Sequence, residues 1–199
     1  MAKSARSLWS EKIKSGTISS KSIGTAKKKS AILTSRNQFY GTVLGIDPSL
    51  RGTGLAVVRY EKNSRPICLD KFCVRNKPTI SMPDCLANIY RNVCAMIIKY
   101  DIKFASIESS IYVQNMNTAV ILGSARGAAI AAVACNQALL YEYAPLRIKQ
   151  AVIGYGRASK EQIIKSIQGL VDNTDKINSD EADAVATALT HIYTFKGTL

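Results

Sequence analysis

Acidic residues, histidine and paired cysteines are scarce in this chain of 199 residues. Asp and Glu number 14 against 27 Lys and Arg, which gives a formal net charge of +13. The single histidine, His191, excludes a catalytic site or metal cage that needs two or more histidines. The five cysteines form no C-x-x-C pair. Neither a disulfide framework nor a zinc site is therefore expected, and the thiols are predicted to be reduced and mostly buried.

Long uninterrupted hydrophobic runs are also missing. The longest apolar stretch, Ala119 to Cys135, contains Arg126 together with glycine and serine, so no membrane span is expected. The excess of positive charge favours a polyanionic partner, with nucleic acid ahead of an anionic membrane. Hydrophobic residues make up 47% of the chain, which is ordinary for a globular protein with a packed core. The length suits one folded domain.

Residues 1–40 hold much of the positive charge, with nine Lys or Arg and one acid, Glu11. This segment is rich in Ser, Lys, Thr and Gly and has no sustained apolar period. We therefore expect a disordered N-terminal extension at 1–40 and a folded domain at 41–199. The extension could add phosphate contacts to any DNA, serve as an organelle transit peptide, or have no required role. These three alternatives stay open from the sequence.

An α/β pattern begins after this extension. Residues 42–47, 54–60 and 67–74 are predicted strands. The turn between the first two is too short for a crossover helix, so these two strands should pair antiparallel. The order of elements predicts an α/β fold in which helices cover a mixed sheet. The remaining predicted elements are a helix at 84–100, a strand at 104–108, a helix at 117–134, a strand at 138–143, a helix at 159–171 and a helix from 178 to about 194.

Four acids stand where such a sheet presents chemistry. Asp47 ends the first predicted strand and Glu108 the fourth, and sites collect at the carboxyl ends of strands. Asp180 and Asp183 are three residues apart in the first turn of the last helix, so they project to one side. Converging carboxylates repel one another, and Mg²⁺ or Mn²⁺ would relieve that repulsion.

Each acid also has an ordinary structural alternative. Asp47 could cap a turn, Asp180 could cap the helix, and Glu108 could be an exposed strand end. Asp183 fits such an alternative less well, because its neighbours on the helix are small and apolar and an unpaired carboxylate there is costly.

Five blocks of sequence stand out, in this order: Leu44–Gly54, Ser106–Glu108, Leu122–Ile130, Ile148–Gly156 with Ala158–Glu161, and Asp180–Ala186 with Thr190–His191. Together they resemble the bacterial RuvC family of Holliday junction resolvases, and the resemblance covers residues 42–194. The resemblance implies an RNase H-like fold with a five-stranded mixed sheet flanked by helices. It also implies a cytoplasmic, homodimeric, Mg²⁺-dependent endonuclease that acts on four-way DNA junctions in recombination and repair. A branch-migration helicase complex of the RuvA/RuvB type is the implied partner, and no membrane is involved.

The resemblance places the family's four metal-binding acids on Asp47, Glu108, Asp180 and Asp183. Two Mg²⁺ ions per site, for which Mn²⁺ would substitute, would activate a water and stabilise the departing 3′-oxygen. The products would carry 5′-phosphate ends. Asp47 is expected to bridge both ions, with Glu108 on one side and the two helix acids on the other.

Five further site residues follow from the same blocks. Lys149 and Lys160 are expected near the scissile phosphate, where they would neutralise charge growing on its oxygens. Arg51 and Arg126 are candidates for phosphate contacts, and Arg126 could equally be a structural anchor. Tyr112 is a candidate for stacking on junction bases, with a core or dimer contact as the alternative.

Other function classes remain as alternatives to a junction resolvase. A ribosomal-RNA processing nuclease of the RNase H-like superfamily is disfavoured by the Asp-x-x-Asp spacing of Asp180 and Asp183. A non-catalytic junction-binding module is disfavoured because four intact carboxylates without metal would be a liability. The Gly52-Thr-Gly54 turn is also typical of actin-like ATPases and sugar kinases. Those enzymes need a second, duplicated domain, for which this length leaves no space. Organelle targeting by the extension remains an alternative to the cytoplasm.

Overall fold

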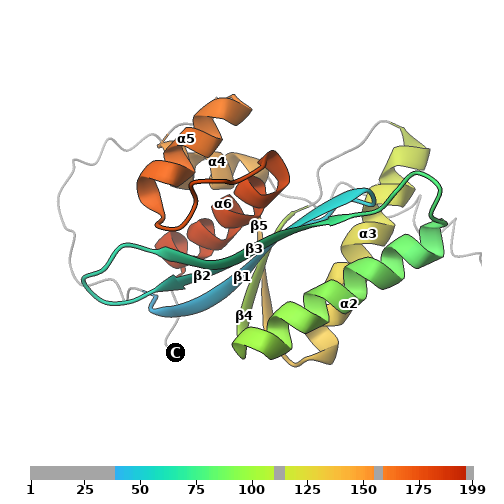
Figure 1. Ribbon diagram of the computed structural model, residues 1–199, viewed down its shortest axis with the longest axis horizontal. Coiled ribbons are helices and arrows are strands. Elements are labelled where there is room, and N and C mark those ends of the chain that lie inside the picture. The colour runs from blue at the N-terminus through green and yellow to red at the C-terminus, as the bar shows by residue number, and fades with distance from the viewer. Residues whose placement is uncertain (1–38, 110–114, 155–158, 196–199) are drawn as a thin grey trace, which may run out of the picture. The chain divides into compact units, whose positions relative to one another are not determined.

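A mixed sheet of five strands forms the centre of the fold (Figure 1). The computed structural model describes residues 39–109, 115–154 and 159–195. The strands are β1 (Gly41–Asp47), β2 (Gly52–Tyr60), β3 (Ile67–Arg75), β4 (Phe104–Glu108) and β5 (Leu139–Tyr143). Their order across the sheet is β3-β2-β1-β4-β5. β2 runs antiparallel to both β1 and β3, whereas β4 runs parallel to both β1 and β5. The predicted antiparallel pair and the mixed sheet are thus confirmed.

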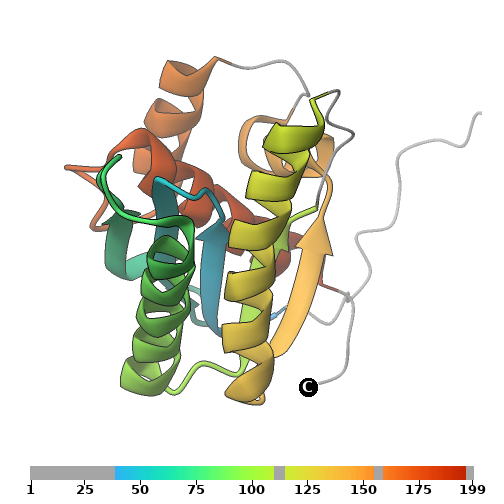
Figure 2. The same ribbon diagram turned by 90° about the vertical axis from the view of Figure 1, so that its right-hand side faces the viewer.

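Helices cover both faces of this sheet (Figures 1 and 2). α2 (Met82–Tyr100) and α3 (Met116–Cys135) lie on one face, side by side. The other face carries α4 (Pro145–Ile153), α5 (Lys160–Leu170) and α6 (Ser179–Thr194). All except α4 are predicted from the sequence. Pro145 is expected only to close a strand, and it also opens this short helix, because its fixed φ and missing N–H suit the first helical turn.

Alternation along the strands divides the apolar core into two layers. Leu44 and Ile46 of β1 belong to the layer under α2 and α3. Val43 belongs to the layer under α4, α5 and α6, because successive side chains of a strand point to opposite faces. The residue after Ile46, Asp47, therefore projects toward the face that α6 covers.

Two glycines allow α6 to lie directly on the sheet. A Cβ atom added to Gly45 of β1 would come within 2.0 Å of the carbonyl oxygen of Ala184. A Cβ atom added to Gly54 of β2 would come equally close, 2.0 Å, to the carbonyl oxygen of Asp180. No side chain fits in such a space, so only glycine permits this approach. Because Gly54 is the register partner of Asp47, the first turn of α6 is brought beside the end of β1.

α3 is the one helix, among the described residues, that is long and apolar enough to cross a membrane by length and composition. This differs from the expectation that no segment would meet such a test. Composition alone is weak evidence, and the position of α3 is that of a helix packed on the sheet: Ala125, Ala129 and Ala132 are fully buried in the core layer that it shares with α2. Arg126, which lies within the same helix, forms an ion pair.

Candidate active site

Asp47 and Glu108 end neighbouring parallel strands. The register pairs Ile46 of β1 with Ile107 of β4, so Asp47 and Glu108 follow at the same level of the sheet. Both isoleucines point into the layer under α2 and α3. Since strand side chains alternate, both carboxylates point to the opposite face, where α6 lies. The predicted convergence of these two acids therefore follows from the strand register.

α6 contributes the other two acids from its first turns. Its N-cap is Asn178, whose side chain accepts a hydrogen bond from the backbone N–H of Glu181 at 3.0 Å. The Glu181 carboxylate in turn accepts from the backbone N–H of Asn178 at 3.2 Å. This capping box satisfies the helix end without Asp180. Asp180 is thus not the N-cap that the sequence allowed as an alternative, and Asp180 and Asp183 project from the helix toward the ends of the strands.

Asp47 lies at the centre of the four acids. Its pKa is raised from 3.8 to about 7, first by burial and then by the negative charges of Asp183, Glu108 and Asp180, in that order. The positive charge of Lys160 acts in the opposite direction. Asp47 is the acid whose pKa responds to all three of the others, in agreement with the convergence that the strand register and the close approach of α6 produce.

Glu108 and Asp183 lie in the same electrostatic environment. Burial is the largest cause that raises the pKa of each, and the charge of Asp183 adds to the rise at Glu108. Lys149 lowers both pKa values, and Lys160 lowers that of Asp183. The structure therefore places both predicted lysines beside the acids, close enough to compensate part of their charge.

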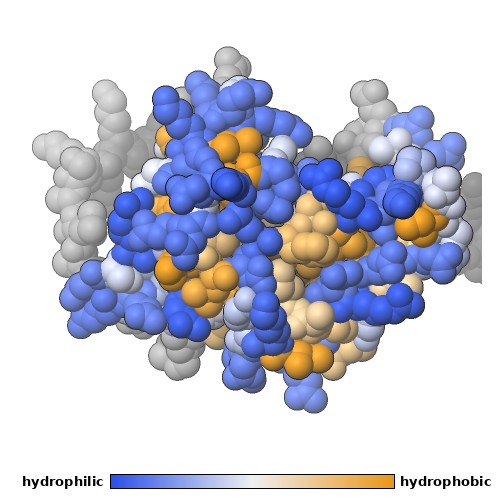
Figure 3. Space-filling model, in the orientation of Figure 1, coloured by the Kyte–Doolittle hydropathy of each residue, from blue (hydrophilic) through white to orange (hydrophobic). Residues whose placement is uncertain are grey.

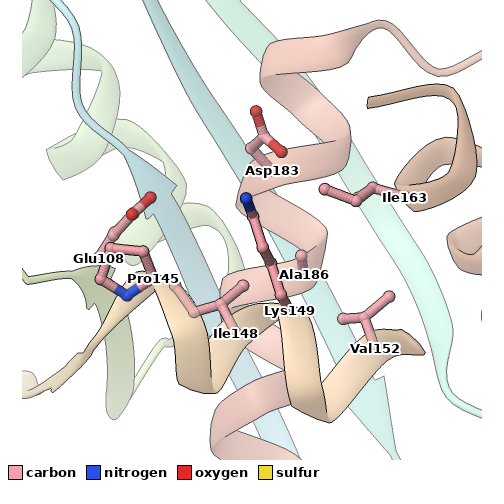
Figure 4. A pocket seen from close by; sticks show the side chains of 8 residues that line it. All are labelled: Glu108, Pro145, Ile148, Lys149, Val152, Ile163, Asp183 and Ala186. Carbon is pink, nitrogen blue, oxygen red and sulfur yellow. The ribbon is translucent and has the colours of Figure 1, made fainter. Parts of the chain in front are cut away.

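A pocket opens between α4, α5 and α6 at this position (Figure 4). Glu108, Lys149 and Asp183 supply its charged groups, and the side chain of Lys149 extends between the two acids in this view. The rest of the lining is small or apolar and comprises Pro145, Ile148, Val152, Ile163 and Ala186. α4, the helix that the sequence did not predict, is the element that holds Lys149 in place.

Asp180 has a partner that the sequence did not indicate. The thiol of Cys73 on β3 donates a hydrogen bond to Asp180 Oδ2, with 3.3 Å between sulfur and oxygen. Burial and the neighbouring Asp180 raise the pKa of Cys73 to about 11, so the thiol stays protonated at neutral pH. Gly52 leaves space for this carboxylate, since a Cβ there would lie 3.0 Å from Asp180 Oδ2. Only the pairing of β3 beside β2 brings these residues together.

Arg51 does not face the acids. Its guanidinium donates to the carbonyl oxygens of Lys77 and Ile80, at 2.6 Å and 3.1 Å, and to the sulfur of Cys85 at 3.3 Å. These bonds tie the turn after β1 to the loop before α2. The structure gives Arg51 the role of holding that turn, and its expected phosphate contact stays a prediction. The stacking candidate Tyr112 lies outside the described residues.

Arg126 lies beside the site, at the main chain of Glu108. Its Nη1 donates to the carbonyl oxygen of Glu108, and its Nη2 pairs with Glu142 Oε2 at 2.7 Å. Of the two alternatives for this residue, the contacts are those of a structural anchor.

The donor chemistry of the cluster fits hard divalent cations. Four carboxylates supply only oxygen atoms, which are the ligands that Mg²⁺ and Mn²⁺ prefer. In the residues that the structure describes, no three His, Cys, Asp or Glu side chains are arranged so that they could hold a metal ion. The two findings are compatible: the acids are near enough to raise one another's pKa, while Asp180 is hydrogen-bonded to Cys73 and Lys149 lies beside Glu108 and Asp183.

Comparison with known proteins supplies the family context. The family model described as "Crossover junction endodeoxyribonuclease RuvC" matches residues 43–191. The crossover junction endodeoxyribonuclease RuvC of Alkaliphilus oremlandii is 37% identical over 153 residues, which are 76% of this chain and 93% of that protein. The RuvC of Finegoldia magna is 36% identical over 152 residues, which are 76% and 92% of the two chains.

Solved structures agree with these matches. T. thermophilus RuvC in complex with a Holliday junction substrate superposes with a TM-score of 0.72 at 27% identity, covering 77% of this chain and 94% of that one. The yeast mitochondrial Holliday junction resolvase Ydc2 reaches a TM-score of 0.56 at 15% identity, over 78% and 80% of the chains. This second likeness shows a shared fold alone. The RNase H-like fold that the resemblance implies is confirmed by the match to T. thermophilus RuvC.

Proposed function

Because the chain belongs to the RuvC family of crossover junction endodeoxyribonucleases, we propose that it resolves four-way DNA junctions by paired symmetric nicks that depend on divalent metal ions. The observation that carries this proposal is the convergence of Asp47, Glu108, Asp180 and Asp183 at one end of the sheet. Three separate elements supply these acids, and two of them press together only because glycines line the contact. Such a charge cluster is costly to fold unless a cation compensates it.

The four acids would hold the metal, which we propose to be two Mg²⁺ ions per site, with Mn²⁺ able to replace them. When bound, such ions activate a water molecule and stabilise the departing 3′-oxygen, which leaves a 5′-phosphate on the product. Asp47 is the acid that interacts with all three others, which supports a bridging position for its carboxylate.

The two lysines are proposed to act on the phosphate. Lys149 projects from α4 beside Glu108 and Asp183, and Lys160 begins α5 beside Asp47 and Asp183. Each ammonium group would neutralise negative charge that develops on the non-bridging oxygens during in-line displacement. Until DNA arrives, the same charges help to keep the neighbouring acids ionised, because both lysines lower the pKa of Asp183.

We also propose a homodimer as the acting form. A four-way junction has approximate two-fold symmetry, and a C₂ dimer presents two identical sites related by the same operation. The N-terminal half of α3 supports this, since Met116, Val120 and Ile121 are exposed there. On the face shown in Figure 3, apolar patches lie among hydrophilic residues, and part of the apolar surface lies over α2 and α3. The small residues farther along α3 are used in the core.

The setting of the activity is a further part of the proposal. We propose that the protein acts in the cytoplasm, in recombination and DNA repair, on junctions handled by a branch-migration complex of the RuvA/RuvB type. Targeting to an organelle by residues 1–40 would change the compartment but not the chemistry. The basic composition of the chain suits each of these settings, because phosphate contacts from Lys and Arg supply most of the affinity for DNA.

Cleavage of a synthetic four-way junction tests the proposal. With Mg²⁺ the protein should introduce two symmetric nicks, and with EDTA it should bind but not cut. Glu108→Gln, Asp180→Asn and Asp183→Asn should each abolish cleavage and leave junction binding largely intact, since phosphate contacts provide the affinity. The matched control is Glu61→Gln, which removes one acid from an exposed turn and should cut at the wild-type rate.

The same assay distinguishes the alternatives. Cleavage of structured RNA but of no DNA junction would indicate a ribosomal-RNA processing type of enzyme. Junction binding without cleavage in Mg²⁺ or Mn²⁺ would indicate a non-catalytic binding module. Cleavage that survives the loss of Glu108 or Asp183 would contradict the assigned site.

A further inference from the structure

Arg126 makes two directed contacts from one guanidinium group. It lies on α3, and its side chain is only 12% exposed. Nη1 donates a hydrogen bond to the main-chain carbonyl oxygen of Glu108, the last residue of β4. Nη2 forms an ion pair with Glu142 Oε2 at 2.7 Å. A planar guanidinium can hold two acceptors in a fixed relative geometry, which a lysine cannot do.

These contacts fall at the ends of two neighbouring strands. The register pairs Ile107 with Glu142 and Glu108 with Tyr143, so Arg126 connects β4 and β5 at the point where their ladder stops. The last bond of that ladder runs from the backbone N–H of Ser109 to the carbonyl oxygen of Tyr143, at 2.8 Å. The carbonyl oxygen of Glu108, which Arg126 takes, is therefore held from the side of α3, whereas the Glu108 carboxylate points to the other face of the sheet.

The environment of the guanidinium does not suit a contact with DNA. A residue that binds phosphate presents its charge to solvent, whereas that of Arg126 is largely buried and already paired with Glu142. A phosphate would have to displace a 2.7 Å ion pair, whose Glu142 side chain is half exposed, and would leave the Glu108 carbonyl oxygen without its donor. Both guanidinium nitrogens instead contact groups of the protein: the Glu108 carbonyl oxygen on β4 and the Glu142 carboxylate on β5.

We propose that Arg126 is a positioning residue for Glu108: it fixes the main chain at the end of β4 so that the Glu108 carboxylate stays directed at Asp183 and Asp47. This inference rests on the proposed function of the acid cluster. In this proposal Arg126 does not contact DNA; it links α3 to the ends of β4 and β5. Residues that orient metal ligands without touching the metal typically change metal affinity or activity by about 10- to 100-fold when they are lost.

The test separates positioning from DNA contact by comparing three variants. Arg126→Ala removes both contacts, Arg126→Lys keeps the charge but not the fixed pair of donors, and Arg91→Ala removes one positive charge from α2 without touching Glu108. We expect Arg126→Ala to lower the single-turnover rate on saturating junction by about 10- to 100-fold, with Arg126→Lys recovering only part of the loss. The junction Kd in EDTA should stay within about twofold of wild type, and Arg91→Ala should cleave at the wild-type rate.

The salt dependence of DNA binding shows which result would contradict the proposal. If Arg126 contacts a phosphate, its loss weakens binding to every DNA and flattens the slope of log K against log salt by about one unit. That result, with an unchanged cleavage rate at saturation, would overturn the proposal. An unchanged slope with a reduced rate supports it.

A readout independent of cleavage keeps this inference separate from the proposed function. Mn²⁺ affinity, measured by electron paramagnetic resonance without DNA, should fall by about 10- to 100-fold in Arg126→Ala and stay at the wild-type value in Arg91→Ala. If wild-type protein cuts no junction but shows this difference, the proposed substrate fails and the positioning role stands. If Arg126→Ala does not fold, Arg126→Lys becomes the variant that tests the proposal, and Glu142→Gln serves as its comparison. Glu142→Gln keeps the bond from Arg126 to the Glu108 carbonyl oxygen, so it should lose less Mn²⁺ affinity and less cleavage rate than Arg126→Lys. Equal Mn²⁺ affinity and cleavage rate in Arg126→Lys and wild type would refute the positioning role.

Discussion

Replacement of Asp47 by asparagine should stabilise the metal-free protein at alkaline pH. The pKa of Asp47 is raised from 3.8 to about 7, mainly by burial and then by the three neighbouring acids. Between these two values the folded protein keeps a proton that the unfolded chain releases. The free energy of unfolding therefore falls as pH rises from about 4 to about 7, and the loss is complete above the folded pKa.

The size of the effect follows from the shift. One pKa unit corresponds to about 1.4 kcal/mol. A rise from 3.8 to about 7 therefore lowers the free energy of unfolding by about 4 kcal/mol at pH 8, relative to a carboxyl group with an unshifted pKa. Asparagine cannot ionise and has nearly the same shape, so Asp47→Asn should remove this destabilisation. For a chain of this length the gain amounts to roughly 2–4 °C in Tm per kcal/mol. At pH 4, where Asp47 is protonated, the variant and wild type should be about equally stable.

Urea denaturation in EDTA at pH 4, 6 and 8 measures this difference, and Glu61→Gln serves as the control with an exposed acid. The m-values should agree between variants, so that differences in midpoint report differences in stability. Addition of Mg²⁺ at pH 8 should stabilise wild type strongly and Asp47→Asn weakly. In wild type the bound cation neutralises four clustered carboxylates, whereas the variant has lost one of these ligands. If Asp47→Asn is less stable than wild type at pH 8, or if the two proteins show the same pH dependence, the clustering of charge around Asp47 is refuted.

Three further predictions concern the support of the site and the N-terminal extension. Gly54→Ala should destabilise the fold by about 3 kcal/mol in urea denaturation, since its Cβ would lie 2.0 Å from the Asp180 carbonyl oxygen; Gly169→Ala, which meets nothing within 4 Å, should be neutral or slightly stabilising. Cys73→Ala should raise the Mg²⁺ concentration for half-maximal cleavage by about tenfold. Cys73→Ser keeps a donor toward Asp180 and should need a Mg²⁺ concentration close to that of wild type. Equal Mg²⁺ titrations for wild type and both variants would contradict this prediction. Deletion of residues 1–40 should flatten the salt slope of DNA binding by about 3 to 4 units if about four phosphate contacts are lost, with junction and linear duplex weakened alike. An unchanged slope, together with an intact mass that lacks the segment, would instead indicate a transit peptide.

Local pattern was sufficient to predict most elements and the positions of the acids. Asp47 and Glu108 could be assigned to strand ends because apolar runs stop there, and Asp180 and Asp183 could be assigned to one side of a helix because Asn178 marks its start. Each of these assignments depends on a few neighbouring residues. Their expected convergence already indicated a divalent-cation site, the resemblance to a family strengthened that assignment, and the metal-binding role stays a proposal.

Contacts between distant segments could not be predicted in this way. Cys73 and Asp180 are far apart in the chain, and nothing near either residue indicates the hydrogen bond between them. The environment of Arg126 depends on how α3 lies against two strand ends, so the sequence alone left phosphate contact and structural anchor open. α4 is short, and its proline is equally typical of a turn. In each case the deciding information lies in tertiary packing.

The position of α6 has a consequence for the order in which the protein is made. Asp47 is synthesised early, at the end of the central strand, whereas the helix that completes its surroundings is the last element of the described chain. A nascent chain that ends before Ser179 contains Asp47 and Glu108 but neither of the helix acids, and the face of β1 around Gly45 has no cover. Domains generally fold as units once their last elements emerge from the ribosome. A chain that is still being translated, or that terminates early, therefore carries the basic residues but lacks the assembled acids. If these acids carry cleavage as proposed, the capacity to cut is acquired only with the final helix.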